Sequence, residues 1–82
     1  MKIHVASYRH ESNGVSASLF QHAPDAFEVV YTDTLDRSTG RESGDWHFAL
    51  VAVHTWGEMV HEKKGSFTHK DEAALRDIGI GI

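Results

Sequence analysis

Alternating apolar and polar residues near the start of the chain predict a β-hairpin. Residues 2–10 alternate loosely, as a half-buried strand does, and the dipeptide Asn13-Gly14 follows them. Both central positions of a type I′ turn need positive φ, which Asn and Gly tolerate, so we expect a second strand after this turn. The alternative is a helix over residues 14–23, capped by Ser12 and ended before Pro24.

The middle of the chain predicts two further strands. Residues 26–35 are rich in β-branched and aromatic types, which favours a strand. Residues 38–44 consist mostly of Ser, Thr and Gly with two charged residues, a composition typical of a turn. Residues 58–67 then return as another strand through the turn Lys63-Lys64-Gly65.

Residues 46–56 form the most apolar run, and their pattern fits two structures. As a strand they are buried on both faces, and the valine content together with Gly57 favours this interpretation, because Gly inside a helix costs about 1 kcal/mol relative to Ala. As a helix they place an apolar stripe on one side. The stripe consists of Trp46, Ala49, Leu50, Val53, Trp56 and Val60.

A short helix is predicted over residues 69–78. Thr68 and Asp71 resemble a capping box, and Gly79 stands where a helix C-cap is expected. Together these elements predict one α+β domain spanning residues 1–82, with a small antiparallel sheet of about three to five strands and one C-terminal α-helix. The alternative is an α/β fold with a truncated doubly wound sheet.

Composition and charge exclude several classes of function. The chain has 82 residues, no cysteine and a net charge of −4, so we expect neither disulfides nor cysteine-bound metal. Its cations are scattered, which disfavours direct nucleic-acid binding. No segment has the length and apolarity of a membrane span, and residues 1–5 do not resemble a signal peptide, so the expected location is the cytoplasm.

The chain is histidine-rich, and three of its residues could share one face of a helix. His54, Glu58 and His61 have the spacing i, i+4, i+7, and imidazole and carboxylate groups suit zinc. On a strand the same residues would lie too far apart to converge. We therefore expect solvent-facing or hydrogen-bonded histidines, no metal and no cofactor. No Gly-x-Ser-x-Gly or phosphate-binding motif is present, so we expect no catalytic residues and no enzyme.

Acidic residues crowd the middle third of the chain. Such a stretch either keeps an edge strand from aggregating or presents a negative edge to a partner protein with a basic surface. Trp46 and Trp56 are expected in the core, and either one would become a candidate contact if exposed. The candidate partner-binding residues are Asp33, Asp36, Glu42, Asp45 and Trp56. A homodimer is an alternative.

Several short segments carry a resemblance to a known family. They are Tyr8-Arg9-His10-Glu11-Ser12, Phe27-Glu28-Val29, Ala49-Leu50-Val51-Ala52-Val53, Thr55-Trp56-Gly57-Glu58, Glu72-Ala73-Ala74-Leu75-Arg76 and Ile78-Gly79-Ile80-Gly81-Ile82. This series resembles the opening half of the trehalose-utilisation (ThuA-like) family. The resemblance implies a glutamine-amidotransferase-like parallel sheet and a small-molecule, sugar-related role with His10 near the ligand. Residues 3–16, His10-Glu11-Ser12-Asn13 above all, are also similar to the first motif of microcystinase-C-like metallopeptidases.

Completeness of the sheet favours the antiparallel interpretation. A parallel sheet that ended at Ile82 would leave exposed the faces that such sheets normally bury. The expected function is therefore that of a small non-enzymatic binding module that acts by protein–protein contacts, as phage and mobile-element inhibitors such as anti-CRISPR proteins do. The alternative is a fragment of a ThuA-like domain.

Overall fold

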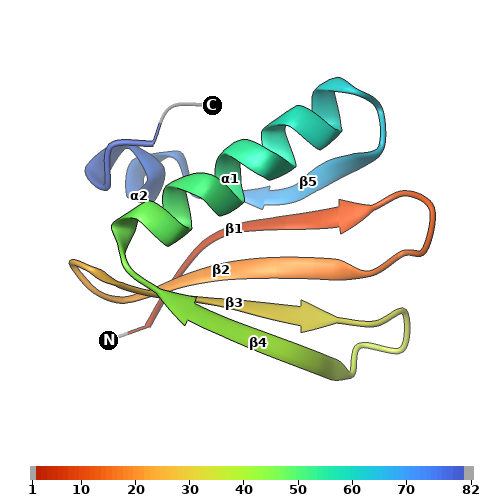
Figure 1. Cartoon of the computed structure of the whole chain (residues 1–82), viewed down its shortest axis with the longest axis horizontal. Coiled ribbons are helices and arrows are strands. Elements are labelled where there is room, and N and C mark those ends of the chain that lie inside the picture. Colours follow the sequence, from red (N-terminus) through yellow and green to blue (C-terminus); the bar gives the residue numbers. More distant parts are fainter. Residues whose placement is uncertain (1, 81–82) are drawn as a thin grey trace.

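The computed structural model describes residues 2–80 and contains a five-stranded antiparallel sheet with two helices (Figure 1). The strand order is β4-β3-β2-β1-β5. The elements are β1 (Ile3–His10), β2 (Ser16–Ala23), β3 (Ala26–Thr32), β4 (Ser38–Gly44), α1 (Trp46–His61), β5 (Gly65–Lys70) and α2 (Glu72–Asp77). The predicted antiparallel α+β class is confirmed, with one main helix in addition to the short C-terminal one. No helix in the described residues is long and apolar enough to cross a membrane.

The first hairpin is confirmed, although its turn differs from the predicted one. β1 pairs antiparallel with β2, and residues 14–23 form no helix because β2 is hydrogen-bonded between β1 and β3. Gly14 has a φ of 69° and donates its N–H to the carbonyl of His10, while the Asn13 side chain accepts from the Val15 N–H. Asn13 keeps negative φ, so the turn is not of type I′, and residues 11–15 form the loop between the two strands. The parallel first pair that the ThuA-like resemblance implies is not formed.

The prediction of a turn at residues 38–44 is wrong, because this segment forms strand β4. The chain reverses earlier, at residues 33–37, where the Asp33 side chain accepts two backbone N–H groups. The prediction of a strand to residue 35 therefore extends beyond the end of β3 at Thr32. Pairing with β3 stabilises the extended backbone of β4 despite its two glycines, so tertiary context overrides local propensity.

The preference for a strand at residues 46–56 is also wrong, because residues 46–61 form α1. Asp45 caps the helix by accepting from the Phe48 N–H, and the buried stripe Ala49, Val53 and Trp56 matches the helical alternative. Gly57 is accommodated inside the helix. The predicted return strand over residues 58–67 begins too early, because α1 continues to His61. The observed strand, β5, spans Gly65–Lys70.

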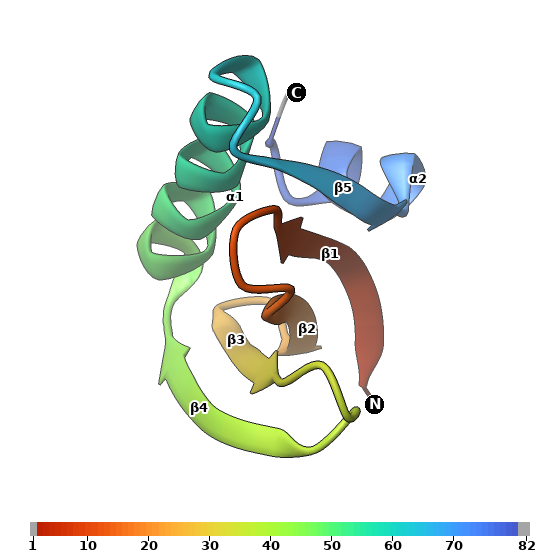
Figure 2. The same ribbon diagram turned by 90° about the vertical axis from the view of Figure 1, so that its right-hand side faces the viewer.

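α1 crosses one face of the sheet, as the view along the strands shows (Figure 2). It packs against β3, β4 and β5 and covers the largest buried side chains of the core, Phe27, Leu19, Val5, Val29 and Val53. The opposite face of the sheet carries polar side chains that include His4, Ser7, Ser18, Glu28 and Arg41. We call it the outer face.

α2 lies beyond the end of β5 (Figure 1), and Ile78, directly after it, accepts a hydrogen bond from the Trp46 indole at the start of α1. Its cap is Asp71, whose side chain accepts from the Ala74 N–H, so the helix begins later than the predicted 69–78. Thr68 belongs to β5 instead of the cap. Gly79 adopts a φ of 81° directly after the helix, as predicted for a C-cap glycine.

Candidate functional site

Strand β4 is an open edge of the sheet. It pairs with β3 on one side, and no strand among residues 2–80 pairs with its other side (Figure 1). Its first six residues are exposed and Gly44 is half-buried. An edge strand of this kind presents unpaired N–H and C=O groups, which can pair with another extended chain.

Four of the sequence-predicted residues lie along this edge. Asp33 and Asp36 are in the turn that precedes β4, Glu42 is within the strand, and Asp45 follows it. Asp36 occupies the left-handed region with a φ of 59° and is exposed. The predicted acidic residues therefore follow one border of the fold, from the β3–β4 turn to the start of α1.

The Asp33 carboxylate is committed to the turn. It accepts the N–H groups of Leu35 and Arg37, each at 2.9 Å, and the Arg37 Nε at 2.9 Å. The hydrogen bond from the Arg37 backbone, followed by the bond from Leu35 and the Arg37 side chain, holds the pKa of Asp33 below its usual value. The role of Asp33 is therefore to stabilise the turn, because its carboxylate is already paired and is not free to bind a ligand.

Glu42 contacts the neighbouring strand across the face that α1 occupies. The Tyr31 hydroxyl donates to Glu42 Oε1 at 2.7 Å. Burial, then this hydrogen bond and the negative charge of Glu42, raise the pKa of Tyr31 to about 12. The bond holds the Glu42 carboxylate over the sheet surface, next to Tyr31.

An apolar groove lies between β4 and α1. The helix begins beside the end of β4 and runs away from that strand toward β5 (Figure 1). A groove of about 390 Å³ lies on the β4 side of the helix. The lining residues are Val29, Tyr31, Glu42, Phe48, Val51, Ala52, Thr55 and Trp56. Most of them are apolar or aromatic, and the charged residue among them is Glu42.

Three exposed large apolar residues border the same strand. They are Leu35 in the β3–β4 turn, Trp46 at the start of α1 and Val51 on α1, with exposed fractions of 68%, 39% and 50%. We call the surface formed by Leu35, Asp36, Glu42, Asp45, Trp46 and Val51, with its groove, the β4 border. Leu35 precedes β4 and Trp46 follows it, so exposed apolar side chains border both ends of the open strand, and Val51 lines its groove. Exposed apolar surface of this kind is typical of interaction sites.

The two tryptophans have different environments. Trp46 is fixed by two hydrogen bonds. Its backbone N–H donates to Asp25 Oδ1 at 2.7 Å, and its indole N–H donates to the Ile78 carbonyl. Trp56 has only 7% of its surface exposed and stacks on Tyr8 in the core. The expected core position is confirmed for Trp56 and wrong for Trp46, which has 39% of its surface exposed. Trp56 also lines the groove, so a partner contact at this residue stays a prediction, and Trp46 becomes a second candidate contact.

Sequence reasoning missed the apolar half of the β4 border. Leu35 belonged to a predicted strand and Val51 to a predicted buried strand, so neither was expected at the surface. A helical interpretation of residues 46–61 would have placed Val51 outside the apolar stripe and exposed it, which was the available signal.

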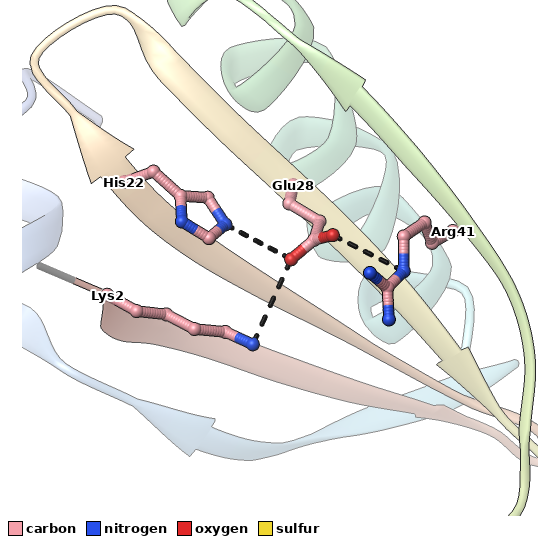
Figure 3. Close-up of polar contacts among 4 residues, drawn as sticks. All are labelled: Lys2, His22, Glu28 and Arg41. Carbon is pink, nitrogen blue, oxygen red and sulfur yellow. Dashed lines mark hydrogen bonds and ion pairs between the residues drawn. The ribbon is translucent and has the colours of Figure 1, made fainter.

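The outer face holds a separate charged cluster around Glu28 (Figure 3). His22 Nε2 donates to Glu28 Oε1 at 3.1 Å, Lys2 Nζ lies 3.9 Å from the same oxygen, and Arg41 Nε lies 3.4 Å from Oε2. The His22 hydrogen bond, then the charges of Arg41 and Lys2, lower the pKa of Glu28. Glu28, on β3, thus contacts Lys2, which precedes β1, His22 on β2 and Arg41 on β4. The positive charges of Lys2 and Arg41 compensate the charge of its carboxylate.

A histidine and serine chain also lies on the outer face. His4 Nε2 is 2.6 Å from Ser7 Oγ, which is 2.8 Å from Ser18 Oγ, and the His4 ring stacks on His69 at 4.2 Å. Burial, then the neighbouring His69, lower the pKa of His4. Ser7 is buried at 7% exposure, so these contacts stabilise the packing of β1 on β2 and β5.

The helical spacing of His54, Glu58 and His61 is realised in α1. All three line a groove of about 500 Å³ beside β5, with Phe67 and Lys70 on its other side. Within residues 2–80, no three His, Asp or Glu side chains come together in a group that could hold a metal ion.

Comparisons with protein-family models, with curated proteins and with solved structures returned no match for this chain.

Proposed function

We propose that the chain is a small protein-binding module that docks on its partner through the β4 border. The observation that carries this proposal is the apolar groove beside an open edge strand. Such a groove offers apolar contacts and backbone hydrogen bonds at one place, which are the two sources of affinity in strand-based recognition. The role requires no cofactor and no chemical step.

The charge of the β4 border supports a partner with a basic surface. Asp36, Glu42 and Asp45 lie along it, and the nearest cations of the same segment, Arg37 and Arg41, are paired with Asp33 and Glu28. Negative charge on this edge would speed the encounter with a basic surface and reject acidic ones. Covering a functional surface of the partner, as inhibitor proteins do, would follow directly from such binding.

Photo-crosslinking tests this proposal in a lysate of the native host. A photoreactive phenylalanine analogue replaces Val51 in one sample and His61, at the far end of α1, in a matched control. Crosslinking of one protein from position 51 and not from position 61 is expected. Equal crosslinking from both positions would contradict a docking site at the β4 border.

Affinity measurements with the purified partner then test the role of charge. Glu42→Lys should raise the Kd about tenfold or more, because it reverses the charge in the centre of the border. Glu62→Lys makes the same change on an exposed residue at the other end of α1 and should leave the Kd unchanged. Equal Kd values for the two variants would remove the β4 border from consideration.

A further inference from the structure

We infer that β4 binds an extended, cationic segment of the partner protein as a sixth, antiparallel strand of the sheet. This inference rests on the proposed function and specifies how the β4 border binds. It derives from three features of the edge: its regular register, its glycines and the position of Glu42.

The register of β4 is regular where a new strand would pair. Residues 40–44 pair with residues 27–31 without interruption, and the register shift lies at the far end, between Tyr31 and Thr32. These residues contain no proline and no lysine, two devices by which edge strands avoid further pairing. The existing pairs of the sheet are all antiparallel, so antiparallel addition continues the same ladder.

The alternation of β4 determines which partner residues face the groove. Gly40, Glu42 and Gly44 pair with Tyr31, Val29 and Phe27, whose side chains lie on the α1 side. Directly opposed residues in an antiparallel pair point to the same face. Partner residues opposite Gly40, Glu42 and Gly44 would therefore point toward α1, and those between them toward the outer face.

Glu42 and Gly40 then specify two partner residues. A Lys or Arg opposite Glu42 would pair with its carboxylate, whose Oε1 already accepts from Tyr31. Two residues later in the partner, opposite Gly40, a large apolar side chain would cover the Tyr31 ring, because glycine leaves that space unfilled. The recognised sequence is thus a basic residue, any residue, and a large apolar residue.

A second copy of this chain fits the edge less well than a cationic segment does. Such a pair would bring two acidic borders together, each of them carrying Asp36, Glu42 and Asp45. Directly opposed like charges destabilise strand pairs, and a twofold axis through Glu42 would place Glu42 opposite its copy. The charge of the border therefore favours a different protein.

Peptide selection tests the inference without knowledge of the partner. Random octapeptides displayed on phage are selected against the full chain, against Glu42→Lys and against the control Glu62→Lys. The expected consensus is basic-x-apolar for the wild type and the control, and loss of the basic preference for Glu42→Lys. No enrichment, or the same consensus with all three chains, would overturn the inference, because strand addition at β4 depends on Glu42 for this preference.

Amide hydrogen exchange of the labelled chain locates the selected peptide. Strand addition predicts slower exchange, by about tenfold or more, at those alternate amides of residues 40–43 that point away from β3, while exchange in β5, the other edge, stays unchanged. Chemical-shift changes of the Tyr31, Phe48 and Val51 side chains on peptide binding, without slower amide exchange in β4, would overturn strand addition. The proposal that the β4 border binds a protein would then still stand. Binding confined to β5 or the outer face would reject both proposals. A dimer through β4 in sedimentation of the free chain would overturn the choice of a different protein.

Discussion

The indole ring of Trp56 lies parallel to the phenol ring of Tyr8, with centroids 6.0 Å apart and planes inclined by 8°. This contact attaches α1 to β1, the strand that lies between β2 and β5. It fixes the diagonal path of the helix, which covers β5 at one end and leaves the groove beside β4 at the other. The candidate site is thus a consequence of how α1 is anchored.

Truncation of Trp56 should destabilise the fold strongly. Trp56→Ala removes a buried aromatic ring, which costs about 3–5 kcal/mol in comparable cores, a large share of the stability of a small domain. Val51→Ala, at the exposed side of the same helix, should change the free energy of unfolding by less than about 0.5 kcal/mol. Urea unfolding measures both. A small effect of Trp56→Ala would show that the helix is held by other contacts.

Replacing two glycines by alanine, one at a time, should change the stability of the fold in opposite directions. At Gly57, inside α1, an added Cβ meets no atom within 4 Å, so Gly57→Ala should stabilise the fold by about 0.5–1 kcal/mol through its helix propensity. At Gly65 an added Cβ would overlap the Tyr8 phenol, so Gly65→Ala should destabilise by about 1–3 kcal/mol. Thermal unfolding measured side by side tests the pair. A stabilising Gly65→Ala would contradict the close approach of β5 to Tyr8.

These positions illustrate why only part of the fold could be predicted from the sequence. The first hairpin, the strand that starts at Ala26 and the glycine cap at Gly79 follow from local patterns, and each is present. β4 was not predictable in this way, because its Ser and Gly residues become extended only by pairing with β3. α1 was misassigned because its valines favour a strand, whereas the Asp45 cap and burial against the sheet favour a helix.

The candidate site, too, could be predicted from the sequence only in part. The acidic residues of the β4 border are close in sequence, so their common edge could be predicted. The groove could not, because it forms where α1 diverges from β4. Both tryptophans were expected in the core, and the exposure of Trp46 could not be predicted without that geometry.

Acid should weaken the fold partly through Glu28. Its pKa is lowered in the folded state, so the unfolded chain binds the proton more tightly than the folded chain does. The stabilisation is therefore complete above the ordinary pKa of about 4.5 and is lost as pH falls through the lower folded value. The unfolding temperature of Glu28→Gln should accordingly depend less on pH between about 5 and 3 than that of the wild type. Parallel curves would show that the contacts with His22, Lys2 and Arg41 contribute nothing.

The bond between Tyr31 and Glu42 should be visible in an alkaline titration. Glu42→Gln removes the carboxylate, so the pKa of Tyr31 should fall from about 12 toward 10.0, remaining above it because burial is the larger cause. Ultraviolet absorbance of the phenolate gives the midpoint, and Tyr31→Phe identifies which transition belongs to this residue. An unchanged midpoint would mean that Glu42 does not lie over the groove as described.

A charge-swap cycle across the β4 border tests the central claim most directly. Calorimetry gives the Kd of the selected peptide and of its Lys→Glu counterpart, each with the wild-type chain and with Glu42→Lys. If the peptide cation lies opposite Glu42, each single swap weakens binding about tenfold or more and the double swap restores much of the loss. Additive losses in the double swap, or no loss in either single swap, would contradict docking of a cationic strand at Glu42.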